Sequence, residues 1–206
     1  MFSRRIREND PETFAQEYQN NPASGGMGVF RREEYKYVTE DDIKVDHDGK
    51  VYVKNRLVNP LVTTDFALSE KEGADYTVLM ATGMDAESNL YVLEYERFRS
   101  SDPFEQMDML FEMMLKWGAD TAVMETVAFQ KVFQRYLEIE MEKRGFHFYI
   151  HELTRHNMRK IFRIKGLKAP IRGGKIYWQH HHDEIEEELG QVTVTSLGTH
   201  DDVIDC

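Results

Sequence analysis

The sequence is poor in cysteine, in positive charge and in long apolar runs. Its 206 residues include a single Cys, at position 206, so no disulfide framework is available and we expect a reducing compartment. The formal net charge of −11 argues against a general nucleic-acid coat or a membrane-surface protein. No apolar run approaches the roughly 20 residues of a membrane span, and the first residues lack the apolar core of a signal peptide. We therefore expect a soluble intracellular protein.

The chain divides into two parts by composition. A hydrophobic fraction of 41% is sufficient for a folded core. The stretch 20–28 is rich in Gly, Pro and Asn, as in a linker, and we expect residues 1–56 to form an N-terminal extension. Within it, the alternation over 44–54 around Asp48 and Gly49 predicts a hairpin. Residues 57–206 are expected to form one domain.

The domain from residue 57 reads as alternating strands and helices. Strands are predicted over 61–68, 76–85 and 90–99, and the short turns between them require antiparallel pairing. The capping pattern predicts a helix between Asp102 and Gly118, and apolar periodicity predicts another over 129–144. Strands over 121–127 and 147–153 should be parallel, because crossovers join them. The fold class is α/β, with a central mixed sheet flanked by helices.

The C-terminal third predicts shorter elements. It contains a basic segment, a short strand over 175–178 and an acidic helix over 183–190, whose charged face we expect to be solvated. Three successive His residues at 180–182 cannot all face one ion, so we do not interpret them as a metal site.

Acidic residues at three places lie in contexts that do not favour a charge. Asp65 falls inside a strand, Glu125 ends a buried strand, and Asp201, Asp202 and Asp205 crowd the last six residues. Converging carboxylates repel one another unless a cation lies between them, and oxygen ligands favour Mg²⁺ or Mn²⁺ over zinc. Simpler explanations are a backbone hydrogen bond for Asp65, a helix-entry charge for Glu125 and an N-cap for the terminal cluster.

Positive charge is concentrated in one segment. Residues 155–175 hold eight basic side chains and no acid. This concentration suggests contact with a phosphate backbone, and a solvated helix face is the alternative. The basic residues that we expect to bind DNA are Arg155, Arg159, Lys160, Arg163, Lys165 and Lys168.

Three sequence segments resemble the nuclease domain of the large terminase subunit of tailed bacteriophages. They are TTDFALSEKEGADYTVLMATG, METVAFQKVFQRYLEIEMEKRG and GTHDDVID. The stretch DPETFAQEYQNNP also resembles the segment that joins the ATPase and nuclease domains of that family. The resemblance implies an RNase H-like fold and a metal-dependent endonuclease that cuts concatemeric double-stranded viral DNA in the host cytoplasm. The portal and the small terminase subunit are the partners that it implies.

The resemblance also implies roles for individual residues. Asp65 matches the first-strand carboxylate and Glu125 the fourth-strand carboxylate, while the third falls on Asp202 or Asp201. Asp205 is a further candidate ligand. Asp65, Glu125 and Asp202 are thus the expected catalytic residues, and one or two Mg²⁺ or Mn²⁺ ions the expected cofactors, acting by two-metal phosphodiester hydrolysis.

Two departures from the family leave other functions open. The chain carries no phosphate-loop motif, so we expect no ATPase domain in it. It also stops one turn into the expected final helix, so we expect that helix to be truncated. The alternatives are a catalytically idle docking module, which contacts DNA, portal or other terminase subunits through 155–175, and another RNase H-like enzyme such as a junction resolvase or a transposase.

Overall fold

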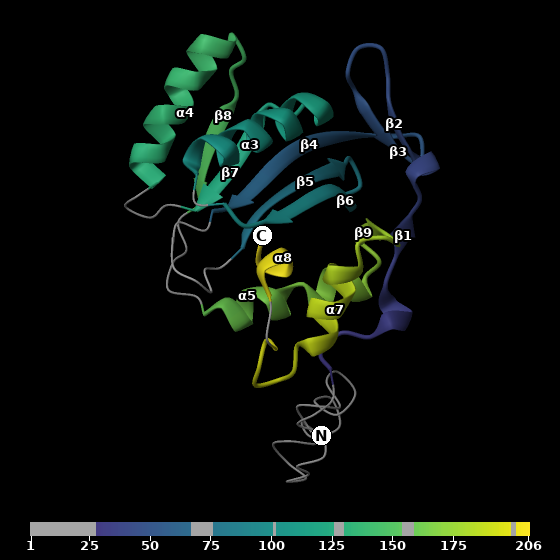
Figure 1. The fold of residues 1–206 in the computed structure, drawn as a ribbon. Helices are drawn as coiled ribbons and strands as arrows, with labels where there is room; N and C mark the ends of the chain where they lie inside the picture. Colours follow the sequence, from purple (N-terminus) through teal and green to yellow (C-terminus); the bar gives the residue numbers. More distant parts are fainter. Residues whose placement is uncertain (1–27, 67–75, 101, 126–129, 154–158, 199–200) are drawn as a thin grey trace, which may run out of the picture.

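A central sheet with helices on both faces forms the core of the molecule (Figure 1). The computed structural model describes residues 28–66, 76–100, 102–125, 130–153, 159–198 and 201–206. Within these residues the sheet has nine strands, of which seven follow the order β1-β9-β6-β5-β4-β3-β2, while β7 pairs with β4 and β8 with β7. Arg155, one of the expected DNA contacts, lies outside the described residues.

Three long antiparallel strands form the centre of the sheet. They are β4 (Arg56–Asp65), β5 (Thr77–Asp85) and β6 (Leu90–Phe98), and their pairing confirms the predicted meander. β4 begins at Arg56, earlier than the expected residue 61. Its first residues pair with a strand from the N-terminal segment, which the turn-rich composition of that segment did not indicate.

Two crossover units extend the meander on the side of β4. Helix α3 (Pro103–Trp117) begins after Asp102, whose side chain accepts the backbone N–H of Phe104, and ends at Gly118, which has φ 59°. Strand β7 (Thr121–Glu125) then runs parallel to β4, and after α4 (Gln130–Arg144) strand β8 (Tyr149–Leu153) runs parallel to β7. The predicted order and directions of these elements are confirmed.

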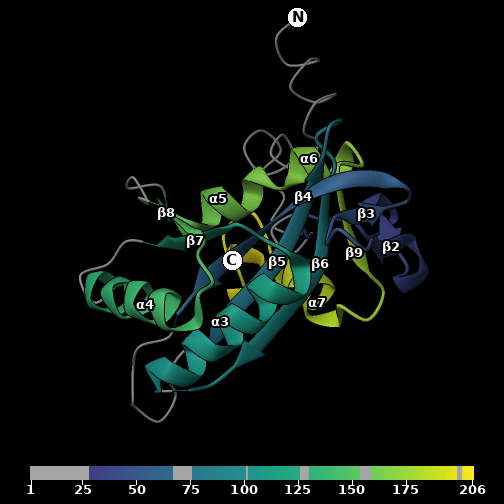
Figure 2. The same ribbon diagram turned by 90° about the horizontal axis from the view of Figure 1, so that it is seen from above.

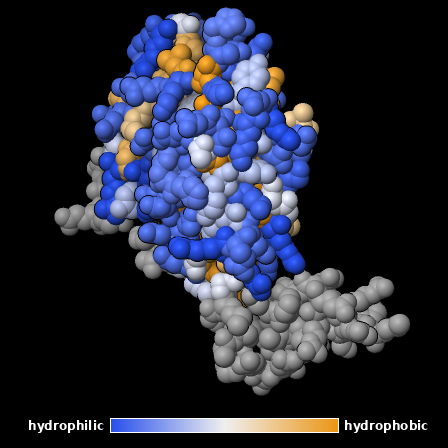
Figure 3. Space-filling view, turned by 90° about the vertical axis from the view of Figure 1, so that its right-hand side faces the viewer, coloured by the Kyte–Doolittle hydropathy of each residue, from blue (hydrophilic) through white to orange (hydrophobic). Residues whose placement is uncertain are grey.

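Three short strands of residues 28–56 pair with the sheet of the domain that follows. Strand β1 (Tyr37–Val38) pairs with β9 (Ile176–Gln179), and the hairpin of β2 (Ile43–Val45) and β3 (Val51–Val53) pairs with β4. Short 3-10 turns, η2 (Arg32–Glu34) and η3 (Glu40–Asp42), precede β1 and β2. The alternation that places Val51 and Val53 in the core anchors this segment to the sheet. Hydrophilic residues cover most of the face that carries these strands (Figure 3).

The helices divide between the two faces of the sheet. In Figure 1, α3 and α4 lie on one side, and α5 (Lys160–Gly166), α7 (Asp183–Gln191) and α8 (Asp202–Asp205) lie on the other. Helix α6 (Lys168–Arg172) follows α5 directly. Each face has its own hydrophobic core, with Phe111 and Leu137 in one and Trp178 and Leu189 in the other. Among the described residues, no helix combines the length and apolar character that crossing a membrane requires.

Candidate active site

Asp65 and Glu125 end two adjacent parallel strands. Thr64 of β4 lies beside Met124 of β7 in the strand register, so the next residue on each strand, Asp65 and Glu125, takes the neighbouring position. Adjacent strands lie about 4.8 Å apart, and the two residues therefore belong to one small region at the end of the sheet. Asp65 is partly buried there.

Helix α8 lies against the same end of β4 and β5. The Cys206 sulfur is 3.4 Å from Thr63 Oγ1 and 3.7 Å from the Val78 carbonyl oxygen. Val78 is the β5 residue in register with Asp65. Figures 1 and 2 both place the C-terminus beside β5, so the acidic residues of α8 approach the sheet near Asp65.

An arginine on β6 holds Asp202. Arg97 is in register with Val78, and its Nη2 atom lies 3.3 Å from Asp202 Oδ2. The Arg97 guanidinium also stacks over the Tyr76 ring at 3.9 Å from the ring centre. This contact attaches Asp202 to β6, which is separated from β4 by β5, and the Asp202 carboxylate is partly exposed.

A buried carboxyl group on α7 supports the start of α8. Glu188 Oε2 accepts the backbone N–H groups of Val203 at 2.9 Å and Ile204 at 3.0 Å. Burial, helped by the charge of Asp202, raises the pKa of Glu188 to about 7 against the opposing effects of the two N–H groups and Arg97. Glu188 thus fixes the turn that presents Asp202.

The other two terminal acids are paired with the basic segment. Lys160 Nζ lies 2.6 Å from Asp201 Oδ1 and 3.5 Å from Asp205 Oδ2, and Arg163 Nη2 lies 2.8 Å from Asp205 Oδ1. Burial lowers the pKa of Lys160, but the hydrogen bond with Asp201 and the nearby carboxylates outweigh burial and raise it. The Asp205 side chain is only 2% exposed, so its charge is balanced inside the protein.

The expected DNA-binding residues therefore differ in their surroundings. Lys160 and Arg163 are engaged by the terminal acids, and Lys165 Nζ donates to the Val194 carbonyl oxygen. Arg159 is exposed at the start of α5, and Lys168 is partly exposed at the start of α6. Among the five described members of this set, Arg159 is therefore the exposed one.

A different acidic group lies in the hairpin that pairs with the first residues of β4. Among the described side chains, Asp46, His47 and Asp48 form the one set of three potential metal ligands within 4.8 Å of one another. They occupy the β2–β3 turn, where Asp46 Oδ1 accepts the N–H groups of Asp48 and Lys50, both at 2.9 Å. The group is explained by turn geometry and lies apart from Asp65.

The sequence did not indicate Arg97 or Glu188 as site residues. The expectation of a solvated acidic face was wrong at Glu188, which is 2% exposed. Glu188 follows Ile185 by three residues and precedes Leu189, and both of these residues are buried, so Glu188 lies on the inner face of α7. This helical spacing was the available sequence signal for its burial. Arg97 carried no comparable signal, because its partners lie far along the chain.

The sequence matches no family model and no curated protein, whereas the fold matches solved structures. The large terminase nuclease from thermophilic phage G20c matches with a TM-score of 0.52 at 14% identity, over 87% of this chain and 94% of that chain. The chain has the fold of a phage large terminase nuclease. The HK97 bacteriophage large terminase has a TM-score of 0.49 at 10% identity, over 88% of this chain and 40% of that chain. The terminase-nuclease fold confirms the expected RNase H-like mixed sheet.

Proposed function

We propose that this chain is a metal-dependent endonuclease that cleaves double-stranded DNA during phage DNA packaging. The adjacent strand ends that carry Asp65 and Glu125 are the main support for the proposal. The match of the fold to a phage large terminase nuclease gives independent support. Portal and small terminase subunit are partners consistent with this role, and the host cytoplasm is the corresponding location.

The residues at this end of the sheet fit a hard divalent cation. Asp65, Glu125 and Asp202 offer carboxylate oxygens, which are the ligands that Mg²⁺ and Mn²⁺ prefer. Asp201 and Asp205 lie 2.6 Å from Lys160 and 2.8 Å from Arg163, closer than the 3.3 Å between Asp202 and Arg97, which makes them the weaker candidates for ligands. One or two bound ions would lower the pKa of a water molecule and neutralise the leaving oxygen of the phosphodiester.

Other residues of the protein would hold the third carboxylate and the DNA backbone in position. Arg97 and Glu188 hold Asp202 at the start of α8, so the third carboxylate is fixed before DNA binds. Arg159 at the start of α5 would contact a backbone phosphate without reading a base. Cleavage should therefore depend weakly on sequence and strongly on salt concentration.

Nicking of supercoiled plasmid DNA in the presence of Mn²⁺ tests the proposal. Asp65→Asn should reduce the nicking rate by at least about 100-fold, because loss of a direct ligand exceeds the usual effect of outer-shell changes. Asp41→Asn, at an exposed position in η3, is the matched control and should nick at the wild-type rate. Equal rates for wild type and Asp65→Asn would reject the carboxylate assignment.

A catalytically idle docking module is the second candidate function. The ion pairs that engage Asp201 and Asp205 favour it, because they reduce the number of acids available to an ion. Calorimetric titration with Mn²⁺ separates the two functions. Binding that Asp65→Asn abolishes supports the nuclease, and no binding at millimolar Mn²⁺ supports the docking module.

A further inference from the structure

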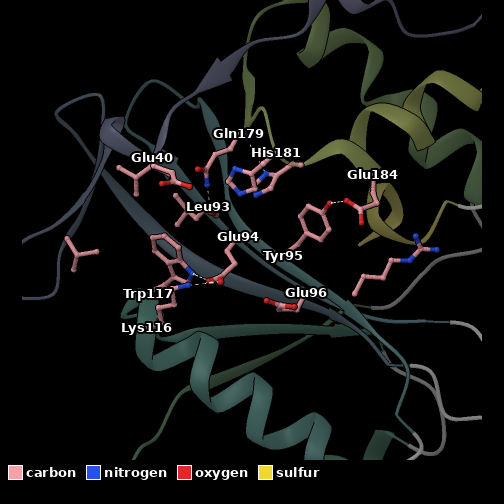
Figure 4. A pocket seen from close by; sticks show the side chains of 14 residues that line it. Glu40, Leu93, Glu94, Tyr95, Glu96, Lys116, Trp117, Gln179, His181 and Glu184 are labelled. Carbon is pink, nitrogen blue, oxygen red and sulfur yellow. Dashed lines mark hydrogen bonds and ion pairs between the residues drawn. The ribbon is translucent and has the colours of Figure 1, made fainter.

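A polar pocket of about 610 Å³ lies on the side of β6 that faces away from β5 (Figure 4). Its walls come from β6, the C-terminal end of α3, the η3–β2 segment and the junction between β9 and α7. We call it the β6 pocket. The lining residues that bear on its chemistry are Glu40, Glu94, Glu96, Trp117, Gln179 and His182.

The β6 pocket carries an excess of negative charge. Four carboxylates and two cationic side chains line it, namely Glu40, Glu94, Glu96, Glu184, Arg97 and Lys116. Lys116 already pairs with Glu94 at 2.6 Å, whereas Glu40 and Glu96 are exposed and form no ion pair within the described parts of the chain. Burial lowers the pKa of His182 to about 4, so this residue is neutral at pH 7 and adds no positive charge. The pocket is therefore suited to a cation.

A buried amide oxygen in the pocket wall lacks a donor. Gln179 is 6% exposed, and its Nε2 atom donates to the Leu93 carbonyl oxygen at 2.8 Å, which fixes the orientation of the amide. Its Oε1 atom has no hydrogen-bond partner among the described residues. Figure 4 shows this amide between the side chains of Glu40 and His181. A buried acceptor without a donor is unfavourable, so a ligand that brings N–H groups would stabilise this arrangement.

The pocket adjoins an open stretch of sheet edge. Strand β9 pairs with β6 only through Leu90 and Tyr91, and in the described structure the later residues of β6 pair with β5 alone. An extended peptide can add to such an edge by backbone hydrogen bonds while one of its side chains enters an adjacent pocket. This edge favours a peptide over an isolated small cation.

We propose that the β6 pocket binds an arginine side chain from a basic, extended segment of a protein partner. A guanidinium group has five N–H donors, so it can serve several of the acceptors that line the pocket, among them Gln179 Oε1 and the carboxylates of Glu40 and Glu96. The Trp117 ring already faces one cation, Lys116 Nζ, at 5.5 Å from the ring centre, so this wall tolerates positive charge. The same negative charge disfavours DNA, and the inference does not rest on the proposed nuclease activity.

The indole N–H signals of the full chain provide the test. The chain contains two Trp residues, of which Trp117 lines the β6 pocket and Trp178 is buried in the core on the other face. The probe is the peptide acetyl-Ala-Arg-Ala-Arg-Ala-amide, and the reference peptide carries Gln in place of both Arg. We expect the Arg peptide to shift the Trp117 signal saturably and leave Trp178 unchanged, and the Gln peptide to shift neither.

Charge-matched variants locate the binding. Combining Glu40→Gln with Glu96→Gln should weaken binding of the Arg peptide at least about tenfold. Combining Glu138→Gln with Glu142→Gln, at exposed positions on α4, makes the same change in net charge and should bind as the wild type does. Equal weakening in both pairs would overturn the proposal, as would a Trp117 shift caused by Mg²⁺ or by DNA with no response to the peptide.

Discussion

Arg97 Nη2 lies 3.3 Å from Asp202 Oδ2 and connects the central meander to the last described helix. Arg97 is in register with Val78, which is in register with Asp65, so the contact lies on one line across the sheet. The position of Asp202 therefore depends on β6 as well as on its own helix.

Removing the Arg97 charge should destabilise the protein. Arg97→Met leaves Asp202 and the buried Glu188 without their shared cation, and we expect the free energy of unfolding to fall by about 2–4 kcal/mol. Urea unfolding measures the change. Arg135→Met, at an exposed position on α4, is the control and should lie within about 0.5 kcal/mol of the wild type. Similar losses in both variants would contradict a specific role for Arg97.

Glu188 should make stability decrease as the pH rises. Its pKa is raised to about 7 from an ordinary value of 4.5, mainly by burial, so the folded state holds the proton more tightly than the unfolded state does. The stability from the protonated group is complete below about pH 4.5 and is lost as the pH rises through 7.

The Glu188→Gln variant tests this dependence, since an amide keeps an acceptor for the Val203 N–H but cannot titrate. Between pH 5 and pH 8, the wild type should lose up to about 3 kcal/mol more stability than the variant does. Parallel pH profiles from urea unfolding would show that Glu188 does not titrate in this range.

Two arginines of the basic segment should have opposite phenotypes. Arg163→Met removes the closer of the two cations beside Asp205, whose side chain is 2% exposed, and should cost about 3 kcal/mol of stability. Arg159→Met changes an exposed residue and should leave stability within about 0.5 kcal/mol.

DNA binding distinguishes the two arginines further. If Arg159 contacts a phosphate, its substitution should reduce the slope of log affinity against log salt by about 1, as measured by fluorescence anisotropy. An unchanged slope would remove Arg159 from the proposed DNA interface.

Asp85 should stabilise the β5–β6 turn in a pH-dependent manner. Burial raises its pKa, but hydrogen bonds from Asn89, Arg56 and Tyr91 outweigh burial and hold the pKa well below its usual range. The stability from Asp85 is therefore present above about pH 4 and is lost as the pH falls below that value.

The Asp85→Asn variant should lose about 2–3 kcal/mol at pH 7, because hydrogen bonds to a charged acceptor are weakened, and less at pH 3. Thermal unfolding at the two pH values measures this, with Asp41→Asn as the control. An equal loss at pH 3 and pH 7 would show that the charge of Asp85 is not what matters.

The meander and the two crossover units could be predicted from sequence because their patterns are long and local. Alternation, the Asp102 cap and the Gly118 terminator each act within a few residues. The strands at 43–45 and 51–53 are too short for a periodic signal to show that they belong to the sheet. Their pairing with β4 depends on tertiary packing of Val51 and Val53, which local propensity does not report.

The ion pairs between the basic segment and the terminal acids could not be predicted from the sequence. The basic segment contains no acid, and this suggested cations available to DNA. The partners of Lys160 and Arg163 lie 41 and 42 residues further along the chain, at Asp201 and Asp205. Only the three-dimensional path of α5 and α8 brings them together. Asp65 and Glu125 could be assigned to strands from sequence, but their adjacency depends on the pairing of β7 with β4, since the α3 crossover joins β7 to β6.

Strand β4 pairs with both β3 and β7, and this determines where recombinant fragments of this protein can begin. Its first residues pair with β3 and its last with β7, so one strand supports both the hairpin and the acidic strand end. A fragment that starts at residue 57 would uncover the edge of β4 at Val58 and delete Val51 and Val53 from the core. Such a fragment should aggregate through that edge, whereas one that begins before Val29 keeps the sheet whole.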